Sequence, residues 1–163
     1  MQYDLNHHIE ITAQAAGAVI FNEQNEVLLV KEMLGSKKGL WHIPSGSVEK
    51  DEFPVNTAER EVKEETGLTL TLNHYLNTYV GRFDDGELVL RHVWFSTYPT
   101  DQAVLPSFSD EIDCARFFSR EEVIALCKEK KLRMHHTMLM IEDGFAFIHQ
   151  KRLNKEQTWC ISP

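Results

Sequence analysis

The sequence has few cysteines and no long apolar run, and both absences narrow the classes of protein that it can encode. Its three cysteines, Cys114, Cys127 and Cys160, are scattered and form no CxxC pair, which argues against a disulfide framework and against a structural zinc site. We therefore expect reduced thiols in a cytoplasmic protein. No stretch approaches the roughly 18 apolar residues of a membrane-spanning helix. The polar residues 1–10 lack the apolar core of a secretory signal.

Positive charge is scarce as well. The chain has 17 Lys and Arg residues against 25 Asp and Glu residues, a net charge of −8, which disfavours binding to long nucleic acids. An acidic protein would also repel a phosphate substrate unless divalent cations bridge its carboxylates to the phosphate oxygens. The 163 residues are otherwise of ordinary globular composition, with 42% hydrophobic and 26% charged residues. We expect them to form a single domain over 1–163.

Residues 46–68 stand out from this ordinary composition, because charged side chains recur there at fixed offsets. Glu61, Glu64 and Glu65 are three and four residues apart, so they project from one side of one helix. Like charges at this spacing destabilise an isolated helix, and a bound divalent cation is the commonest reason to keep them. Mg²⁺ takes oxygen ligands that are shared between a few carboxylates and substrate phosphates. The pattern therefore indicates half of a metal-dependent phosphate site.

The spacing of this stretch resembles the Nudix box, the signature of the Nudix hydrolase (MutT-like) family. Gly46 is followed after five residues by Glu52, and seven further residues lead to the run Arg60-Glu61-Val62-Lys63-Glu64-Glu65-Thr66-Gly67-Leu68. Every fixed position of the box is matched, and the resemblance is looser in the flanking strands. The segment before the box departs from the family pattern by carrying Ser45 where a glycine is usual, which could alter the turn beside the metal.

The resemblance implies a role for each residue of the box. Glu64 and Glu65 are expected to be the principal ligands of Mg²⁺ or Mn²⁺, and Glu61 to complete the set or to orient the attacking water. The backbone carbonyl near Gly46 would also reach a metal. The alternative is that the acidic face is only a solvated helix surface.

Three further residues of the box are expected to be structural, and one carboxylate outside it is a candidate general base. Arg60 can hold the loop against the helix through a forked contact with Glu52, and Gly67 stands where a left-handed helix terminator is expected. Glu111 precedes a late strand, where many family members place an acidic residue that also binds metal. The alternative for Glu111 is a solvated loop carboxylate.

Substrate contacts are expected from basic and aromatic residues near the presumed cleft. The basic candidates for binding phosphates are Lys37, Lys38, Arg82 and Arg91. The aromatic candidates for stacking on a base are Trp41, Tyr79, Phe83 and Trp94. Among these rings Phe83 is the expected exposed contact, and Trp94 is expected in the core. The adjacent His135 and His136 are interpreted as surface histidines, because neighbouring side chains diverge and rarely bind one ion.

Apolar periodicity and turn residues predict a chain in which strands and helices intermix without a strict βαβ alternation. Strands are expected over residues 15–21, 27–30, 69–72, 76–83, 88–98 and 112–118. Helices are expected from Pro54 to Gly67, from Ser119 to about Lys131 and over residues 137–150. This order is typical of the α+β class. The family resemblance implies a Nudix-type α/β/α sandwich, with a mixed β-sheet between helices.

The resemblance also implies an activity. The expected enzyme depends on Mg²⁺ or Mn²⁺ and cleaves the pyrophosphate bond of a nucleoside diphosphate linked to another group. Segments 81–83 and 90–94 are most similar to bacterial Nudix enzymes that act on nucleoside or dinucleoside polyphosphates, while ADP-ribose, sugar nucleotides and RNA ends stay open. The alternative is a non-catalytic, nucleotide-sensing Nudix-like module, which usually carries a damaged box. The expected partner is a small-molecule nucleotide, and a homodimer is the default expectation for assembly.

Overall fold

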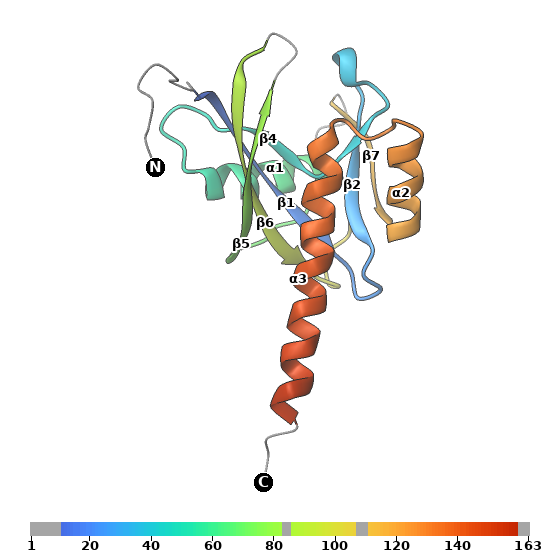
Figure 1. Ribbon diagram of the computed structural model, residues 1–163. Coiled ribbons are helices and arrows are strands. Elements are labelled where there is room, and N and C mark those ends of the chain that lie inside the picture. The colour runs from blue at the N-terminus through green and yellow to red at the C-terminus, as the bar shows by residue number, and fades with distance from the viewer. Residues whose placement is uncertain (1–10, 83–85, 107–110, 160–163) are drawn as a thin grey trace, which may run out of the picture.

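The computed structural model describes residues 11–82, 86–106 and 111–159 (Figure 1). The predicted contact residue Phe83 and the cysteine Cys160 lie outside this part of the chain. No helix within the described ranges is long and apolar enough to cross a membrane.

A mixed sheet forms the centre of the molecule. Its strands are β1 (Ile11–Phe21), β2 (Val27–Glu32), β3 (Trp41–His42), β4 (Ser45–Ser47), β5 (His74–Arg82), β6 (Leu88–Thr97) and β7 (Ile112–Phe118). The strand order is β3-β2-β1-β6-β5, with β4 also paired to β1 and β7 to β2. β1 and β6 run parallel to each other, whereas the other pairs are antiparallel. The long parallel pair fixes the register of the sheet's centre.

Helices cover both faces of this sheet (Figure 1). They are α1 (Pro54–Thr66), α2 (Arg120–Lys128) and α3 (His135–Trp159), together with the short 3-10 turn η1 (Gly35–Lys37). Side chains of a strand point alternately to its two faces. Phe21 of β1 accordingly packs with Val123 of α2 and Met140 of α3, while Ile20 packs with Ala58 of α1 on the opposite face. The predicted α+β class, with a mixed sheet between helices, is confirmed.

Most predicted elements form with bounds shifted by a few residues; for example, β1 begins at Ile11 and α2 ends at Lys128. The strand expected over 69–72 does not form, because side chains take the backbone groups that a strand would use. The amide of Thr69 donates to Gln102 Oε1 over 2.7 Å, and the amide of Leu72 donates to Glu59 Oε1 over 2.9 Å.

The last helix is also longer than predicted, since it begins at His135 and ends at Trp159. Gly144 does not interrupt it, because this glycine lets the helix approach the sheet closely. A Cβ atom at Gly144 would lie 2.7 Å from the Phe21 ring.

Candidate active site

The loop before α1 is fixed to the helix by one carboxylate and one guanidinium. Arg60 Nε donates to Glu52 Oε1 and Arg60 Nη2 to Glu52 Oε2, each over 3.1 Å, which is a forked contact. Glu52 Oε2 also accepts from Thr57 Oγ1 over 2.7 Å. These donors, Arg60 first, lower the pKa of Glu52 to about 2. The N-cap residue of α1 is Phe53, which is 72% exposed and provides no capping hydrogen bond. The contacts of Glu52 with Arg60 and Thr57 hold this end of the helix instead.

Arg60 also contacts two of the three predicted metal ligands. Its Nη1 donates to Glu61 Oε1 over 2.7 Å and to Glu64 Oε2 over 3.1 Å. One nitrogen atom thus lies between two carboxylates on the same face of α1. Glu61 is mostly buried, and loss of hydration raises its pKa despite the Arg60 contact.

The turn of β4 approaches the Glu61 carboxylate closely. A Cβ atom built on Gly46 would lie 2.0 Å from Glu61 Oε1, so a side chain at this position would displace the carboxylate. The helix ends at Gly67, whose φ of 78° is left-handed and whose amide donates to Lys63 O. The two glycines of the box therefore serve different needs, close packing at Gly46 and backbone conformation at Gly67.

Glu65 points inward, toward the sheet. Its Oε2 accepts a hydrogen bond from the backbone amide of Ser45 over 2.9 Å. Burial raises the pKa of Glu65 well above its usual value, and the charges of Glu61 and Glu32 raise it further. A buried carboxylate with carboxylate neighbours is stabilised when a cation joins the group. Ser45 occupies the position where the family pattern has a glycine, and its amide still reaches the box.

Glu111 lies at the edge of this acidic group. It is exposed, and its backbone carbonyl accepts from the Met33 amide over 2.8 Å. Its charge contributes to the raised pKa of Glu61, so the two carboxylates are close enough to interact.

The donor set fits a divalent cation in its chemistry. Glu61, Glu64 and Glu65 offer carboxylate oxygens, the ligands that Mg²⁺ prefers, and the first two already share one positively charged partner. Within the part of the chain that the structure describes, no three acidic, His or Cys side chains converge on one point as they stand. Arg60 holds the position between Glu61 and Glu64, so a cation there would have to displace its Nη1 while Glu52 retains the rest of the guanidinium.

A cavity of about 250 Å³ lies between η1, the β5–β6 pair and the start of α3. Its lining residues are mostly basic and comprise Lys37, Gly81, Arg82, Arg91, Arg133, Met134 and His136. Arg91 is only 7% exposed, and its burial, with the charge of Arg133, lowers its pKa to about 10. Burial and the charges of His135 and Arg91 lower the pKa of His136 as well. The cavity thus concentrates positive charge in a protein whose net charge is −8.

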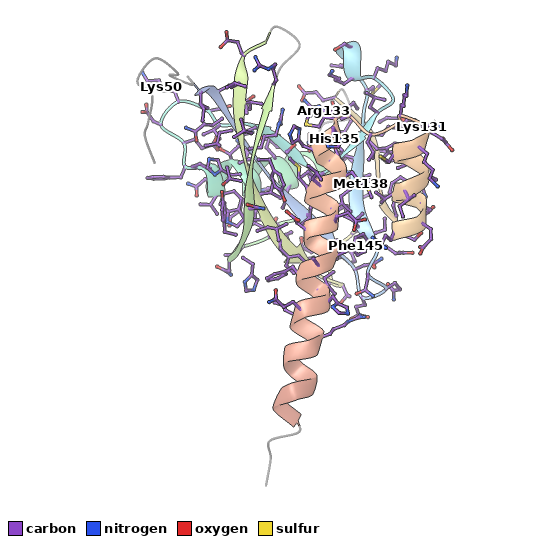
Figure 2. The ribbon with its side chains drawn as sticks, in the orientation of Figure 1. Lys50, Lys131, Arg133, His135, Met138 and Phe145 are labelled. Atoms are coloured by element: carbon purple, nitrogen blue, oxygen red, sulfur yellow. The ribbon has the colours of Figure 1, made fainter. Side chains whose placement is uncertain are left out.

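Backbone pairing places the chain before α3 at this cavity. The Trp41 amide donates to Lys131 O and the Arg133 amide to Trp41 O, each over 2.8 Å. In addition, His42 Nδ1 and Thr137 Oγ1 are hydrogen-bonded over 2.7 Å. Figure 2 shows Arg133 and His135 at the start of α3.

One ion pair joins the acidic group to the cavity. Arg133 Nη1 donates to Glu32 Oε1 over 2.8 Å, and Glu32 is one of the charges that act on Glu65. The Glu32–Arg133 pair therefore connects the basic cavity with the carboxylates of α1.

The structure brings together some of the predicted contact residues and not others. Of the four basic candidates, Lys37, Arg82 and Arg91 line the cavity, whereas Lys38 is exposed and is not among its lining residues. Trp94 is in the core, as expected, and Trp41 and Tyr79 are also buried, so none of the three offers a free face for a base.

Sequence reasoning missed Glu32, Arg133 and His136. No short motif marks Glu32 or Arg133. The interpretation of the adjacent histidines as surface residues agrees with the exposed His135, whereas His136 is partly buried and lines the cavity.

Comparison with known proteins yields consistent matches. The family model described as NUDIX domain matches residues 12–139. Phosphatase NudJ of Escherichia coli (strain K12) is 32% identical over 107 residues, which cover 66% of this chain and 69% of the relative. A NUDIX hydrolase from Nitrosomonas europaea is similar in structure, with a TM-score of 0.69 and 26% identity, covering 82% of this chain and 88% of the other.

A C. elegans Ap4A hydrolase, solved as a binary complex, shares the fold. Its TM-score is 0.68 at 22% identity, with 85% of this chain and 99% of the other covered.

Proposed function

This chain belongs to the Nudix family of hydrolases, and on that premise we propose that it cleaves the pyrophosphate bond of a nucleoside diphosphate linked to another group, with Mg²⁺ or Mn²⁺ as cofactor. A nucleoside or dinucleoside polyphosphate is the proposed substrate class, and the cytoplasm is the proposed location. The observation that carries the proposal is the junction of partly buried carboxylates on α1 with a basic cavity, through the Glu32–Arg133 pair.

Each side of the junction has its own task in this proposal. Glu61, Glu64 and Glu65 hold the cation, which when bound neutralises phosphate charge and lowers the pKa of an attacking water. Glu111, exposed at the edge of the group, is the proposed base that accepts the proton of that water. Arg82 and Arg91 bind and orient the anionic substrate from the cavity side. Arg60, through Glu52 and Ser47 O, keeps the loop and the helix in register.

The relatives lend support at the level of chemistry. One is called a phosphatase, and one structural neighbour is an Ap4A hydrolase, so phosphate-bearing substrates are common to both. The identity of the nucleotide is left to experiment.

A substrate panel tests the proposal. Nucleoside di- and triphosphates, dinucleoside polyphosphates, ADP-ribose and sugar nucleotides are incubated with the protein and Mg²⁺ in ¹⁸O-labelled water, and the products are identified by mass. We expect one class to be cleaved at a pyrophosphate bond, with ¹⁸O in one product only, which names the attacked phosphorus. EDTA should abolish this turnover and added Mg²⁺ should restore it.

Two results would count against the proposal. Turnover that is insensitive to EDTA would remove the metal from the mechanism. Tight nucleotide binding without cleavage of any compound would favour the sensing module instead.

A further inference from the structure

Among the residues that the structure describes, those lining the basic cavity offer no surface suited to a nucleobase. Among the described residues, its lining includes no aromatic ring apart from the His136 imidazole and no carboxylate. Bases are recognised by stacking on flat rings and by paired donors and acceptors. The walls here supply cationic donors: Lys37 from η1, Arg82 and Arg91 from β5 and β6, and Arg133 before α3. Such walls match the oxygens of a phosphoryl group.

The fold places the basic side chains of the cavity close together, which is electrostatically unfavourable. A Cβ atom built on Gly81 would lie 3.6 Å from Arg91 Nε and 3.7 Å from the His136 ring, so these two groups share one wall. Arg91 belongs to a central strand, where it pairs with Ala15 of β1 and Tyr79 of β5. Arg91 and Arg133, which both line the cavity, carry like charges that repel each other, and an anion between them offsets this repulsion. The cavity is therefore preorganised for a negative ligand.

One donor in this region has no hydrogen-bond partner within the described part of the chain. The Nε atom of Arg133 is buried and unsatisfied, although Nη1 of the same side chain is paired with Glu32. A buried donor without a partner is unfavourable, and ligand oxygens commonly satisfy such groups.

From these observations we propose that the basic cavity binds a terminal phosphoryl group of the substrate, and that the enzyme selects its substrate by the phosphate chain rather than by the base. This proposal rests on the proposed function, since it takes the scissile diphosphate to lie at the carboxylates of α1. The group next along the chain then enters the cavity past the Glu32–Arg133 pair. Compounds with a further phosphoryl group, such as nucleoside triphosphates, are preferred over those that end in a neutral sugar.

Binding of inorganic pyrophosphate in the presence of EDTA tests the cavity apart from catalysis. Isothermal titration calorimetry should show binding to the full chain that weakens about tenfold, or about 1.4 kcal/mol, in Lys37→Gln and in Arg82→Gln. Lys128→Gln, an exposed residue of α2, removes the same charge away from the cavity and should bind like the unmodified protein. Gly81→Val should also weaken binding, because it fills the cavity without changing its charge.

A spectroscopic measurement locates the anion. The pKa of the His136 ring, followed by NMR and assigned with His136→Gln, should rise when pyrophosphate binds, since an anion offsets the effect of Arg91 and His135. Equal weakening in Lys128→Gln, or an unchanged His136 pKa with pyrophosphate bound, would place the anion elsewhere and overturn the proposal.

The substrate panel tests whether the enzyme distinguishes between nucleobases. If the base is not read, ATP, GTP, CTP and UTP should have kcat/KM values within about tenfold of each other, a spread of about 1.4 kcal/mol. A preference for one base by about a hundredfold or more would overturn base-independent selection. If no nucleotide is cleaved, the proposed function fails, and the pyrophosphate measurements still decide whether the cavity is an anion site.

Discussion

The acidic group on α1 and the basic cavity are electrostatic opposites built by the same means. On the acidic side, burial raises the pKa values of Glu61 and Glu65. On the basic side, burial lowers the pKa values of Arg91 and His136. In both places the protein holds like charges out of water, where each charge is less favourable than it would be in solvent.

The acidic group and the basic cavity differ in the kind of ligand that offsets the repulsion between their charges. Carboxylates are relieved by a cation, and guanidinium groups by an anion. A magnesium–polyphosphate complex carries both signs, and it would satisfy the two regions at once. The pairing explains how a protein of net charge −8 could accept a strongly anionic substrate.

The largest expected effect comes from the acidic side. Glu65→Gln removes the charge of a buried candidate ligand but keeps an oxygen that can accept from the Ser45 amide. We expect kcat to fall by about 10³-fold, the size typical of removing a group that stabilises transition-state charge, with the fold unchanged by circular dichroism. The measurement is steady-state turnover of the best substrate of the panel at saturating Mg²⁺.

Glu59→Gln provides a matched control on the same helix. Its amide oxygen can still accept from the Leu72 amide, so it makes the same chemical change outside the acidic group. Full activity in Glu65→Gln would remove that residue from the ligand set.

Substitutions in the basic cavity should change KM rather than kcat. Lys37→Gln and Arg82→Gln are expected to raise KM about tenfold while changing kcat less than about twofold, because a contact equally strong in the ground state and the transition state affects binding alone. The measurement is the full dependence of rate on substrate concentration, compared with Lys128→Gln. A fall in kcat with constant KM would show that these cations act on the transition state.

The part of the site that lies close together in the sequence could be predicted. Glu61, Glu64 and Glu65 share one helix face because of their spacing, and Pro54 and Gly67 set the ends of that helix by local backbone preference. The core layers follow in the same way from alternation along β1. These features depend on neighbours within a few residues, which sequence patterns record.

The rest depends on contacts between distant segments. Glu32 and Arg133 are 101 residues apart, and neither local sequence contains a pattern that predicts this ion pair. Lys37 and Lys38 look equivalent in the chain, but the 3-10 turn η1 directs one of them to the cavity. His136 reaches the cavity because α3 begins two residues earlier than its apolar periodicity indicates.

The junction between the two regions should give an intermediate effect. Arg133→Gln leaves the partly buried Glu32 carboxylate without its guanidinium, and we expect the free energy of unfolding to fall by about 2 kcal/mol, the usual size for a lost charged hydrogen bond. In the double variant Glu32→Gln/Arg133→Gln much of this loss should be recovered, because the uncompensated carboxylate is gone. Urea denaturation of the four proteins measures the coupling, and strictly additive losses would contradict it.

The smallest expected effect belongs to Glu52, whose pKa is lowered, whereas the pKa values of Glu61 and Glu65 are raised. Because its pKa in the folded protein is about 2, below the ordinary value of 4.5, its charge stabilises the fold above about pH 4.5. That contribution is lost as the pH falls toward 2. Glu52→Gln should therefore reduce the free energy of unfolding by about 1 kcal/mol at neutral pH, and the deficit should shrink between pH 4.5 and 2.

Urea denaturation of both proteins across this pH range measures the deficit, and Glu23→Gln, in the exposed turn after β1, controls for general charge. A deficit that stays constant down to pH 2 would mean that Arg60 does not stabilise the charged form of Glu52. The contrast within the box, between a carboxylate already satisfied by the protein and carboxylates that await a cation, would then lose its electrostatic basis.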